Sequence, residues 1–162
     1  MKLIGKGSFT KCYLLDDKTV ELHSCCYIKE CMSLDWFPNS RLFPKIESID
    51  YGIYRCKYYP KVRSLKSELK PNQYQIYKDL RALSLGYINN KHDYLDKWIE
   101  EFKTLKNKRL KEIMLQAIQA CSNYGSDIGF EISPRNVAVN NGNLILLDCF
   151  YSISQLQQTR KY

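Results

Sequence analysis

The amino-acid sequence predicts an α+β protein that combines an antiparallel β-sheet with a mainly helical second part. Residues 3–59 hold short apolar and β-branched runs separated by turns, a pattern typical of strands. Residues 72–121 repeat apolar side chains at helical spacing, and residues 137–147 place two short apolar runs around Asn140-Asn141-Gly142-Asn143, a strong hairpin signal. At 162 residues, the chain is long enough to bury a core without disulfides or metals.

The strand-rich part contains one candidate hairpin turn, Asp16-Asp17-Lys18. The segment 33–44 contains two prolines and is too short and broken for a long helix. The pattern changes at Pro60, which predicts a boundary between residues 1–60 and residues 61–162. The expected strands of the first part cover residues 3–4, 12–15, 19–22, 26–28, 45–49 and 53–59.

The second part begins with apolar spacing that predicts a helix over residues 72–86. Between residues 92 and 121 two apolar stripes follow each other out of phase, and the break near Asn107 predicts two helices or one kinked helix. A basic cluster lies mostly off both stripes, which favours a solvated face over a nucleic-acid surface. This cluster consists of Lys103, Lys106, Lys108, Arg109 and Lys111.

The composition limits the classes of partner and the compartment. A net charge of +8 permits contact with nucleic acid, a phosphate-bearing ligand or an acidic partner, but we find no aromatic–basic motif of a nucleic-acid-binding module. The longest wholly aliphatic run is Leu144–Leu147, far short of the about 20 apolar residues of a membrane span. No signal-peptide core follows Met1.

The seven cysteines are scattered, odd in number and never spaced as C-x-x-C, and His23 and His92 are the only histidines. We therefore expect free thiols, no structural zinc, and a cytoplasmic protein that works in the reducing cytosol of a bacterium, a virus-infected cell or a host.

Three segments carry residues suited to phosphate chemistry. The glycines of Gly5-Lys6-Gly7-Ser8-Phe9 let backbone amides approach a phosphate, because no Cβ intervenes. Lys29 follows an apolar pair on an expected strand, and its ammonium can hold phosphate oxygens. Asn136 and Asp148 bracket the predicted hairpin, so that their oxygens can share a magnesium ion. Each segment alone is a weak signal, with a tight turn, a solvated lysine, a capping Asn and a surface Asp as ordinary explanations.

Taken in order, these segments resemble the protein kinase superfamily over residues 3 to about 150. The resemblance implies a two-lobed protein-kinase-like fold, with an antiparallel β-sheet N-lobe and a reduced, mainly helical C-lobe. It also implies ATP and Mg²⁺ as cofactors in the cleft between the lobes.

The resemblance assigns a role to each candidate residue. Gly5, Lys6, Gly7, Ser8 and Phe9 correspond to the glycine-rich loop, and Tyr58 falls in the hinge beside the nucleotide. Lys29 falls at the third-strand lysine, Glu131 at the catalytic-loop aspartate, and Arg135 could supply a cation near the transferred phosphate. Asn136 and Asp148 fall at the two magnesium ligands.

The departures from the family pattern are equally informative. Thr10 stands at the third glycine, H-R-D becomes Gly129-Phe130-Glu131, and D-F-G becomes Asp148-Cys149-Phe150. No long helix that could supply a glutamate partner for Lys29 fits before Pro44, and we expect no activation segment after Asp148.

Two functions from different classes follow. The first is a minimal kinase that binds Mg-ATP and transfers phosphate to a protein hydroxyl. The second is a catalytically dead pseudokinase that acts as a protein-interaction or inhibitory module. A nucleic-acid binder is the least favoured alternative. Because a reduced C-lobe would leave Met114 to Ile118 uncovered unless residues 72–85 pack there, we also expect a homo-oligomer or a protein ligand.

Overall fold

The computed structural model describes residues 1–85 and 94–160, and it confirms a mixed α+β protein with a five-stranded antiparallel sheet. The strands follow the order β1-β2-β3-β5-β4, and the turn at Asp16 joins β2 to β3, with Lys18 N donating to Asp16 Oδ1 over 2.8 Å. The strands are β1 (Lys2–Lys6), β2 (Thr10–Leu14), β3 (Thr19–Ser24), β4 (Glu47–Asp50) and β5 (Ile53–Lys57).

The strand expected over residues 26–28 is wrong, because this segment begins the helix α1 (Tyr27–Met32). Ile28 and Cys31 are both buried in the main core, and their spacing of three positions matches one helical face. A short apolar run does not distinguish a strand from a buried helix. The packing of α1 against β9 and α5 decides the outcome.

The helical expectations of the second part are confirmed where the structure describes them. The break near Asn107 separates two helices, and the Asn107 side chain caps the second one by accepting from Leu110 N at 3.1 Å. The helices are α2 (Leu65–Glu68), α3 (Pro71–Leu85), α4 (Tyr94–Lys103), α5 (Lys108–Cys121) and α6 (Ile153–Arg160).

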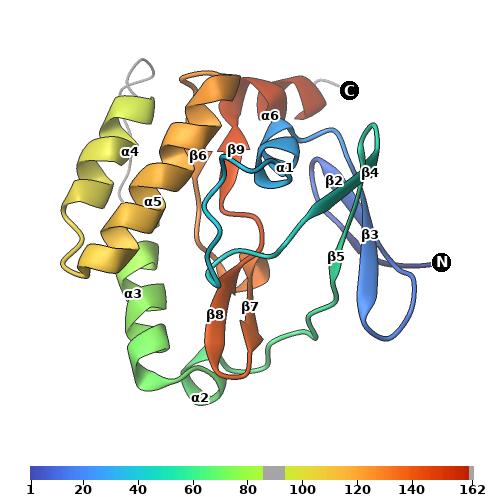
Figure 1. Ribbon diagram of the computed structural model, residues 1–162, viewed down its shortest axis with the longest axis horizontal. Coiled ribbons are helices and arrows are strands. Elements are labelled where there is room, and N and C mark those ends of the chain that lie inside the picture. The colour runs from blue at the N-terminus through green and yellow to red at the C-terminus, as the bar shows by residue number, and fades with distance from the viewer. Residues whose placement is uncertain (86–93, 161–162) are drawn as a thin grey trace.

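Two small antiparallel pairs complete the fold. The predicted hairpin is confirmed as β7 (Val137–Asn140) and β8 (Asn143–Leu146). The pair β6 (Ile128–Phe130) and β9 (Phe150–Ser152) was not expected from the sequence. In Figure 1, the five-stranded sheet lies on one side, α3, α4 and α5 lie on the other, and α1 and the β7–β8 hairpin lie between them.

An aromatic cluster forms the centre of the main core. The Phe130 ring lies 5.3 Å from Trp98, 5.0 Å from Phe102 and 5.3 Å from Phe150, measured between ring centroids. These four rings join α4 to the β6–β9 pair. A smaller core under the five-stranded sheet contains Val20, Leu22, Ile46 and Tyr54.

The expected apolar surface on α5 is not present. Met114, Ala117 and Ile118 are each 0% exposed, so the surface argument for self-association at Met114 to Ile118 is wrong. The neighbouring helices α4 and α1 pack against α5. The basic cluster, in contrast, is largely exposed, as expected. Among the described residues, no helix combines the length and apolarity that crossing a membrane requires.

The β7–β8 turn offers a test of the fold. Asn141 and Gly142 both have positive φ, at 52° and 78°, and a Cβ on Gly142 would lie 3.0 Å from Lys70 Cγ. We expect Gly142→Ala to lower the free energy of unfolding by about 1–2 kcal/mol, because an L side chain is strained in this conformation. Urea denaturation measures the loss. Asn141→Gly is the matched control and should not destabilise; equal losses in both variants would contradict the turn geometry.

Candidate functional site

Lys29 and Asp148 are brought together from distant parts of the sequence. Lys29 Nζ lies 3.9 Å from Asp148 Oδ1 and donates to the Leu147 carbonyl oxygen at 3.3 Å. The expectation that Lys29 lies on a strand is wrong, because it lies on α1. Its side chain is only 6% exposed, whereas that of Asp148 is 47% exposed. A buried ammonium thus faces a carboxylate that solvent and ligands can reach.

Backbone hydrogen bonds position Asp148 beside the segment that carries the other candidate residues. Leu147 N donates to the Asn136 carbonyl at 2.9 Å, and Glu131 N donates to the Cys149 carbonyl at 2.8 Å. One bond is made by the residue before Asp148 and the other by the residue after it. Main-chain hydrogen bonds therefore fix which segment lies beside Asp148. Asn136, Glu131 and Asp148 therefore belong to one small backbone unit.

The Lys29 ammonium acts on two cysteine thiols of the five-stranded sheet. Burial raises the pKa of the Cys56 thiol to about 11, and the Lys29 ammonium acts in the opposite direction. Burial also raises the pKa of the Cys12 thiol, and the Lys29 ammonium opposes part of that rise. Cys12 lies on β2 and Cys56 on β5, so the charge of Lys29 acts on side chains of the five-stranded sheet as well as on Asp148.

Cys149 has a different environment. Its thiol is buried, and burial followed by the negative charge of Asp148 raises its pKa. A thiol that stays protonated at neutral pH is a poor nucleophile and a poor metal ligand. Burial in the core and the raised pKa thus disfavour Cys149 as a metal ligand.

The glycine turn lies next to the start of α1. Gly7 N donates to the Thr10 carbonyl at 2.8 Å, which closes a turn between β1 and β2. Thr10, which replaces the third glycine, forms a hydroxyl–hydroxyl bond of 2.6 Å with Ser24, and Ser24 Oγ accepts from Cys26 N at 3.1 Å. Cys26 is the N-cap residue of α1, so side-chain contacts link the turn to the helix that carries Lys29.

A cavity of about 540 Å³ lies beside this turn. The predicted loop residues Lys6, Gly7, Ser8 and Phe9 line it, together with residues 25–27 at the start of α1. Gly5 lies within β1, where a Cβ would approach Cys12 Cβ at 3.7 Å, an ordinary contact. The turn itself therefore has room for a ligand on its α1 side.

The C-terminal helix also holds α1, which sequence reasoning missed. Gln155 of α6 is buried, its Oε1 accepts from Tyr27 N at 3.2 Å, and its Nε2 donates to the Cys25 carbonyl. Figure 1 shows α6 and α1 side by side. Asp127 fixes the start of α6, because its Oδ2 accepts from Ser154 N at 2.7 Å. Nothing in the sequence signals these contacts, since about 130 positions separate Gln155 from its partners.

Among the residues that the structure describes, the side chains of Glu131, Arg135 and Tyr58 form no hydrogen bond or ion pair with the Lys29–Asp148 pair. Glu131 is exposed and lines a second cavity, of about 530 Å³. Arg135 is exposed within a short 3-10 turn after Pro134, and Tyr58 lies half-buried just after β5, with its N donating to the Lys18 carbonyl at 2.8 Å. The structure thus brings Lys29 and Asp148 into contact but does not gather the whole predicted set around them.

The Tyr151 ring fills the space beside the Gly129 backbone. A Cβ on Gly129 would lie 2.3 Å from Tyr151 Cζ, so this close approach requires glycine. The pairing of Gly129 with Tyr151 in the β6–β9 ladder produces this contact.

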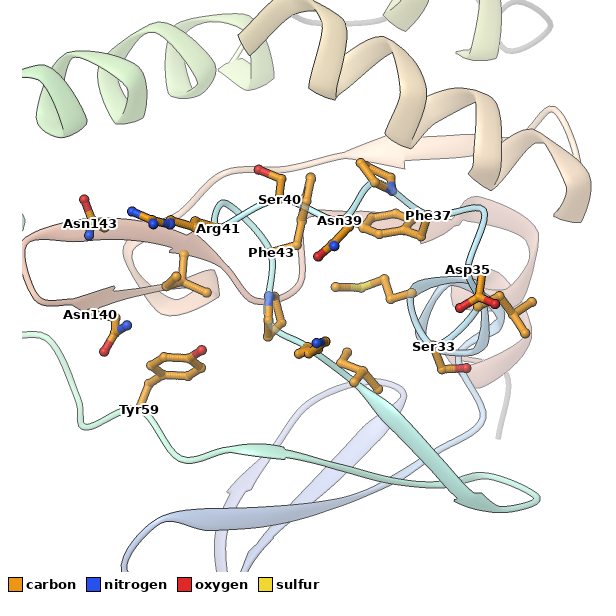
Figure 2. Close-up of a pocket in the computed structure, with 17 residues that line it drawn as sticks. Ser33, Asp35, Phe37, Asn39, Ser40, Arg41, Phe43, Tyr59, Asn140 and Asn143 are labelled. Atoms are coloured by element: carbon orange, nitrogen blue, oxygen red, sulfur yellow. The ribbon is translucent and has the colours of Figure 1, made fainter. Parts of the chain in front are cut away.

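A third cavity, of about 660 Å³, lies between the segment 32–46 and the β7–β8 hairpin. Figure 2 shows Arg41 on the same side as Asn143, with Tyr59 and Asn140 on the sheet side. None of the predicted site residues lines this cavity.

Comparison with known proteins gives one distant structural similarity. No family model matches the chain, and no curated protein matches it. A solved structure described as the streptomycin–ATP–APH(2″)-IIa ternary complex aligns with a TM-score of 0.42 and 12% identity, covering 95% of this chain and 68% of that one. Similarity at this level assigns neither a family nor a function to the chain.

The contacts of Gln155 can be tested directly. We expect Gln155→Ala to lower the free energy of unfolding by about 1–3 kcal/mol, because the Tyr27 amide and the Cys25 carbonyl would lose their partner. Gln158→Ala is the control on the exposed side of the same helix, and it should change stability by less than about 0.5 kcal/mol. Urea denaturation compares the two. Equal effects would mean that α6 does not hold α1.

Proposed function

We propose that this protein is a kinase-like phosphotransferase that uses Mg-ATP to phosphorylate a hydroxyl group. The observation that carries the proposal is the meeting of Lys29, a buried cation, with Asp148, a half-exposed acid. Isolated buried cations are costly, and an ammonium that faces an accessible carboxylate suits phosphoryl transfer. The division into a sheet lobe (1–60) and a helical lobe (61–162) belongs to the same proposal.

The magnesium ligands would be Asp148 and Asn136. Mg²⁺ keeps several waters and takes one or two protein oxygens together with the phosphates of its substrate, so two side chains are enough. The exposure of Asp148 leaves room for such a shared ion. Among the described residues no group of three His, Cys, Asp or Glu is placed to hold a metal alone, so the ion would arrive with the nucleotide.

Each residue would then have a defined part. Mg-ATP, when bound, supplies the phosphoryl group and neutralises its charge. The Lys29 ammonium would orient phosphate oxygens, and the amides of the Gly5–Phe9 turn would hold them. The Glu131 carboxylate would accept the proton of the acceptor hydroxyl, and Arg135 would stabilise charge on the transferred group. Tyr58 would border the adenine.

The sequence predicts a protein hydroxyl as the acceptor and a cytoplasmic location. The odd number and scattered spacing of the seven cysteines in the sequence support a reducing compartment. The alternative, a pseudokinase that acts as an interaction module, would retain the fold without transfer.

A nucleotide-binding test uses Lys29→Met, which removes the ammonium but keeps most of the apolar stem, with Lys103→Met on the exposed face of α4 as the matched control. With Mg-ATP at about 100 times its Kd, we expect about 2.7 kcal/mol of stabilisation for the parent and the control, and little for Lys29→Met. Thermal denaturation measures the difference. Equal stabilisation of all three proteins would contradict a role of Lys29 in nucleotide binding.

Phosphoryl transfer itself is tested with ATP labelled at its γ-phosphate. The parent protein should transfer label, while Asp148→Asn and Lys29→Met should lose most of the rate. If the parent binds Mg-ATP but transfers no more label than these variants, the pseudokinase alternative is favoured.

Cys25 reports on the glycine turn. Its exposed thiol donates to the Phe9 carbonyl at 3.7 Å. We expect Mg-ATP at about ten times its Kd to slow alkylation of Cys25 about tenfold, because only the unliganded fraction reacts. Peptide mapping after iodoacetamide treatment measures the rate. Unchanged reactivity in the presence of bound nucleotide would place the nucleotide away from the turn.

A further inference from the structure

The cavity between the segment 32–46 and the β7–β8 hairpin has features that the proposed nucleotide site does not use. Its volume is about 660 Å³, within the range of small-molecule sites. Among the described residues that line it, Arg41 and Lys45 are basic and Asp35 is the acidic one. Figure 2 shows Arg41 at one end of the cavity, with Asn140 and Asn143, and Asp35 at the other. The end with Arg41, Asn140 and Asn143 is the basic end of the cavity.

Two lysines orient the side-chain amides of Asn140 and Asn143. Lys57 Nζ donates to Asn140 Oδ1 at 2.9 Å. Lys70 Nζ donates to Asn143 Oδ1 at 3.4 Å. An ammonium can only donate, so each amide presents its oxygen to the lysine and keeps its NH₂ group for another acceptor. Each amide therefore offers a ligand a donor, and the two lysines bring further positive charge to the hairpin.

The two basic side chains that line the cavity have no partner in the part of the chain that the structure describes. Both Arg41 and Lys45 are exposed, and neither forms a hydrogen bond or an ion pair there. A guanidinium carries five N–H donors in a planar fork, which fits the oxygens of a phosphate or a carboxylate. These donors are therefore available to a ligand.

Hydrogen bonds on both sides of Arg41 fix its backbone. The Leu42 carbonyl accepts from Leu146 N at 2.7 Å, which joins this segment to the end of β8. Leu42 N donates to Ser40 Oγ at 3.1 Å, and Phe43 N donates to the Ser40 carbonyl at 3.2 Å. Leu42 and Phe43 are buried, whereas Arg41 is exposed. A backbone that is already ordered lowers the entropic cost of binding a ligand through Arg41.

Tyr59 adds a neutral donor on the sheet side of the cavity. Burial raises the pKa of its phenol, so the hydroxyl stays protonated at neutral pH. Lys57 Nζ lies 5.5 Å from the centre of its ring. The phenol can therefore donate a hydrogen bond without adding negative charge to the cavity.

The donors of the cavity suit a doubly charged head that is rich in oxygen. A carboxylate offers two oxygens and one negative charge, whereas a phosphomonoester offers three terminal oxygens and a charge of about −1.5 to −2 at pH 7. Arg41, Lys45 and the two amides supply more donors than one carboxylate can use. The apolar side chains of the lining suit an apolar or aromatic body that carries this head. They include Met32, Phe37, Phe43, Ile46 and Ile145.

We propose that this cavity binds a phosphomonoester, whose phosphate is held by the cations of Arg41 and Lys45 and by the amides of Asn140 and Asn143. The proposal does not depend on the phosphotransferase function, because none of the residues assigned to nucleotide binding lines this cavity. Both a free phosphorylated small molecule and a phosphorylated side chain of a protein present the same chemistry.

Binding is tested with phenyl phosphate as the probe, by calorimetry and ligand-observed NMR on the full chain in a phosphate-free buffer. The probe should bind saturably at millimolar concentrations or below. Arg41→Met should weaken it about ten- to a hundredfold, because the charge-assisted hydrogen bonds of the guanidinium are lost. Arg109→Met, at an exposed arginine of α5 outside the cavity, is the matched control and should leave the affinity unchanged. Absence of saturable binding, or equal losses in both variants, overturns the proposal.

Asn143→Asp tests the amide without changing the size of the side chain. The carboxylate keeps an oxygen for Lys70, so the midpoint of urea denaturation should not fall. The substitution replaces an NH₂ donor with a negative charge, which should weaken phenyl phosphate at least tenfold. A folded variant with the probe affinity of the parent would show that the hairpin does not hold the phosphate, and the proposal would fail.

The charge of the head is tested by pH and by a singly charged analogue. The second pKa of a phosphomonoester is about 6, so the affinity for phenyl phosphate should fall about tenfold between pH 7.5 and pH 5. The titratable groups of the described lining are Asp35, Arg41, Lys45 and Tyr59, and none of them is a histidine. Phenyl sulfate carries one charge at both pH values and should bind more weakly at pH 7.5, with little change at pH 5. Equal affinities of the two probes at pH 7.5 would contradict the phosphomonoester assignment.

Variants at the two sites separate this cavity from the proposed nucleotide site. Arg41→Met should keep the stabilisation by Mg-ATP expected for the parent, and Lys29→Met should keep the parent's affinity for phenyl phosphate. If Lys29→Met loses the probe while Arg41→Met keeps it, the phosphate binds at Lys29 and the proposal is overturned.

A peptide with one phosphotyrosine between two alanines on each side distinguishes the two sources of the phosphate. Tighter binding of this peptide than of phenyl phosphate supports a phosphorylated protein segment as the ligand. Equal or weaker binding supports a free phosphorylated small molecule. The unphosphorylated peptide is the control and should not bind; an affinity equal to that of the phosphorylated peptide would contradict the role of the phosphate.

Discussion

The site depends on the backbone ladder that joins residues 131–136 to residues 147–149. This ladder has two main-chain hydrogen bonds, from Glu131 N to the Cys149 carbonyl and from Leu147 N to the Asn136 carbonyl. They set the backbone positions of the two candidate acids, Glu131 and Asp148, and of the candidate amide, Asn136. The aromatic core holds the ladder from behind, because Phe130 pairs with Phe150 in register and both rings pack on Phe102. Burial of these rings therefore fixes the geometry of exposed residues several positions away.

Lys29 reaches this ladder from the helix α1, so the residues that hold α1 in place also determine the position of the Lys29 ammonium. A lysine on a central strand would be held by the sheet, whereas α1 has only six residues and depends on its neighbours. The Ser24 hydroxyl accepts a hydrogen bond from the N-cap residue of α1. Gln155 forms hydrogen bonds with the residue before that N-cap and with the residue after it. The ammonium is consequently coupled both to the glycine turn and to the C-terminal helix.

The departures from the kinase pattern have structural counterparts. Thr10, at the position of the third glycine, uses its hydroxyl to bond Ser24, which a glycine could not do. Gly129, at the position of histidine, admits the Tyr151 ring, and that ring forms a wall of the cavity that Glu131 lines. Thr10 thus contributes to the contacts of the glycine turn, and Gly129 to a wall of the cavity that Glu131 lines.

The sequence by itself determined the elements whose signals are local. The break before α5 follows from the Asn107 cap, and the β7–β8 turn follows from Asn141 and Gly142, which tolerate positive φ. The proximity of Asn136 and Asp148 could also be predicted, because one short hairpin joins them. These features need only neighbours along the chain.

The tertiary structure alone decided the rest. The segment 27–32 became a helix because its buried face packs on α5, and the three-residue strands β6 and β9 are too short and too buried to show an alternating pattern. Gln155 has no local signal because its partners lie far away in sequence. The donors at the basic end of the cavity between the segment 32–46 and the β7–β8 hairpin come from parts of the chain that are far apart in sequence, and no linear pattern encodes their meeting.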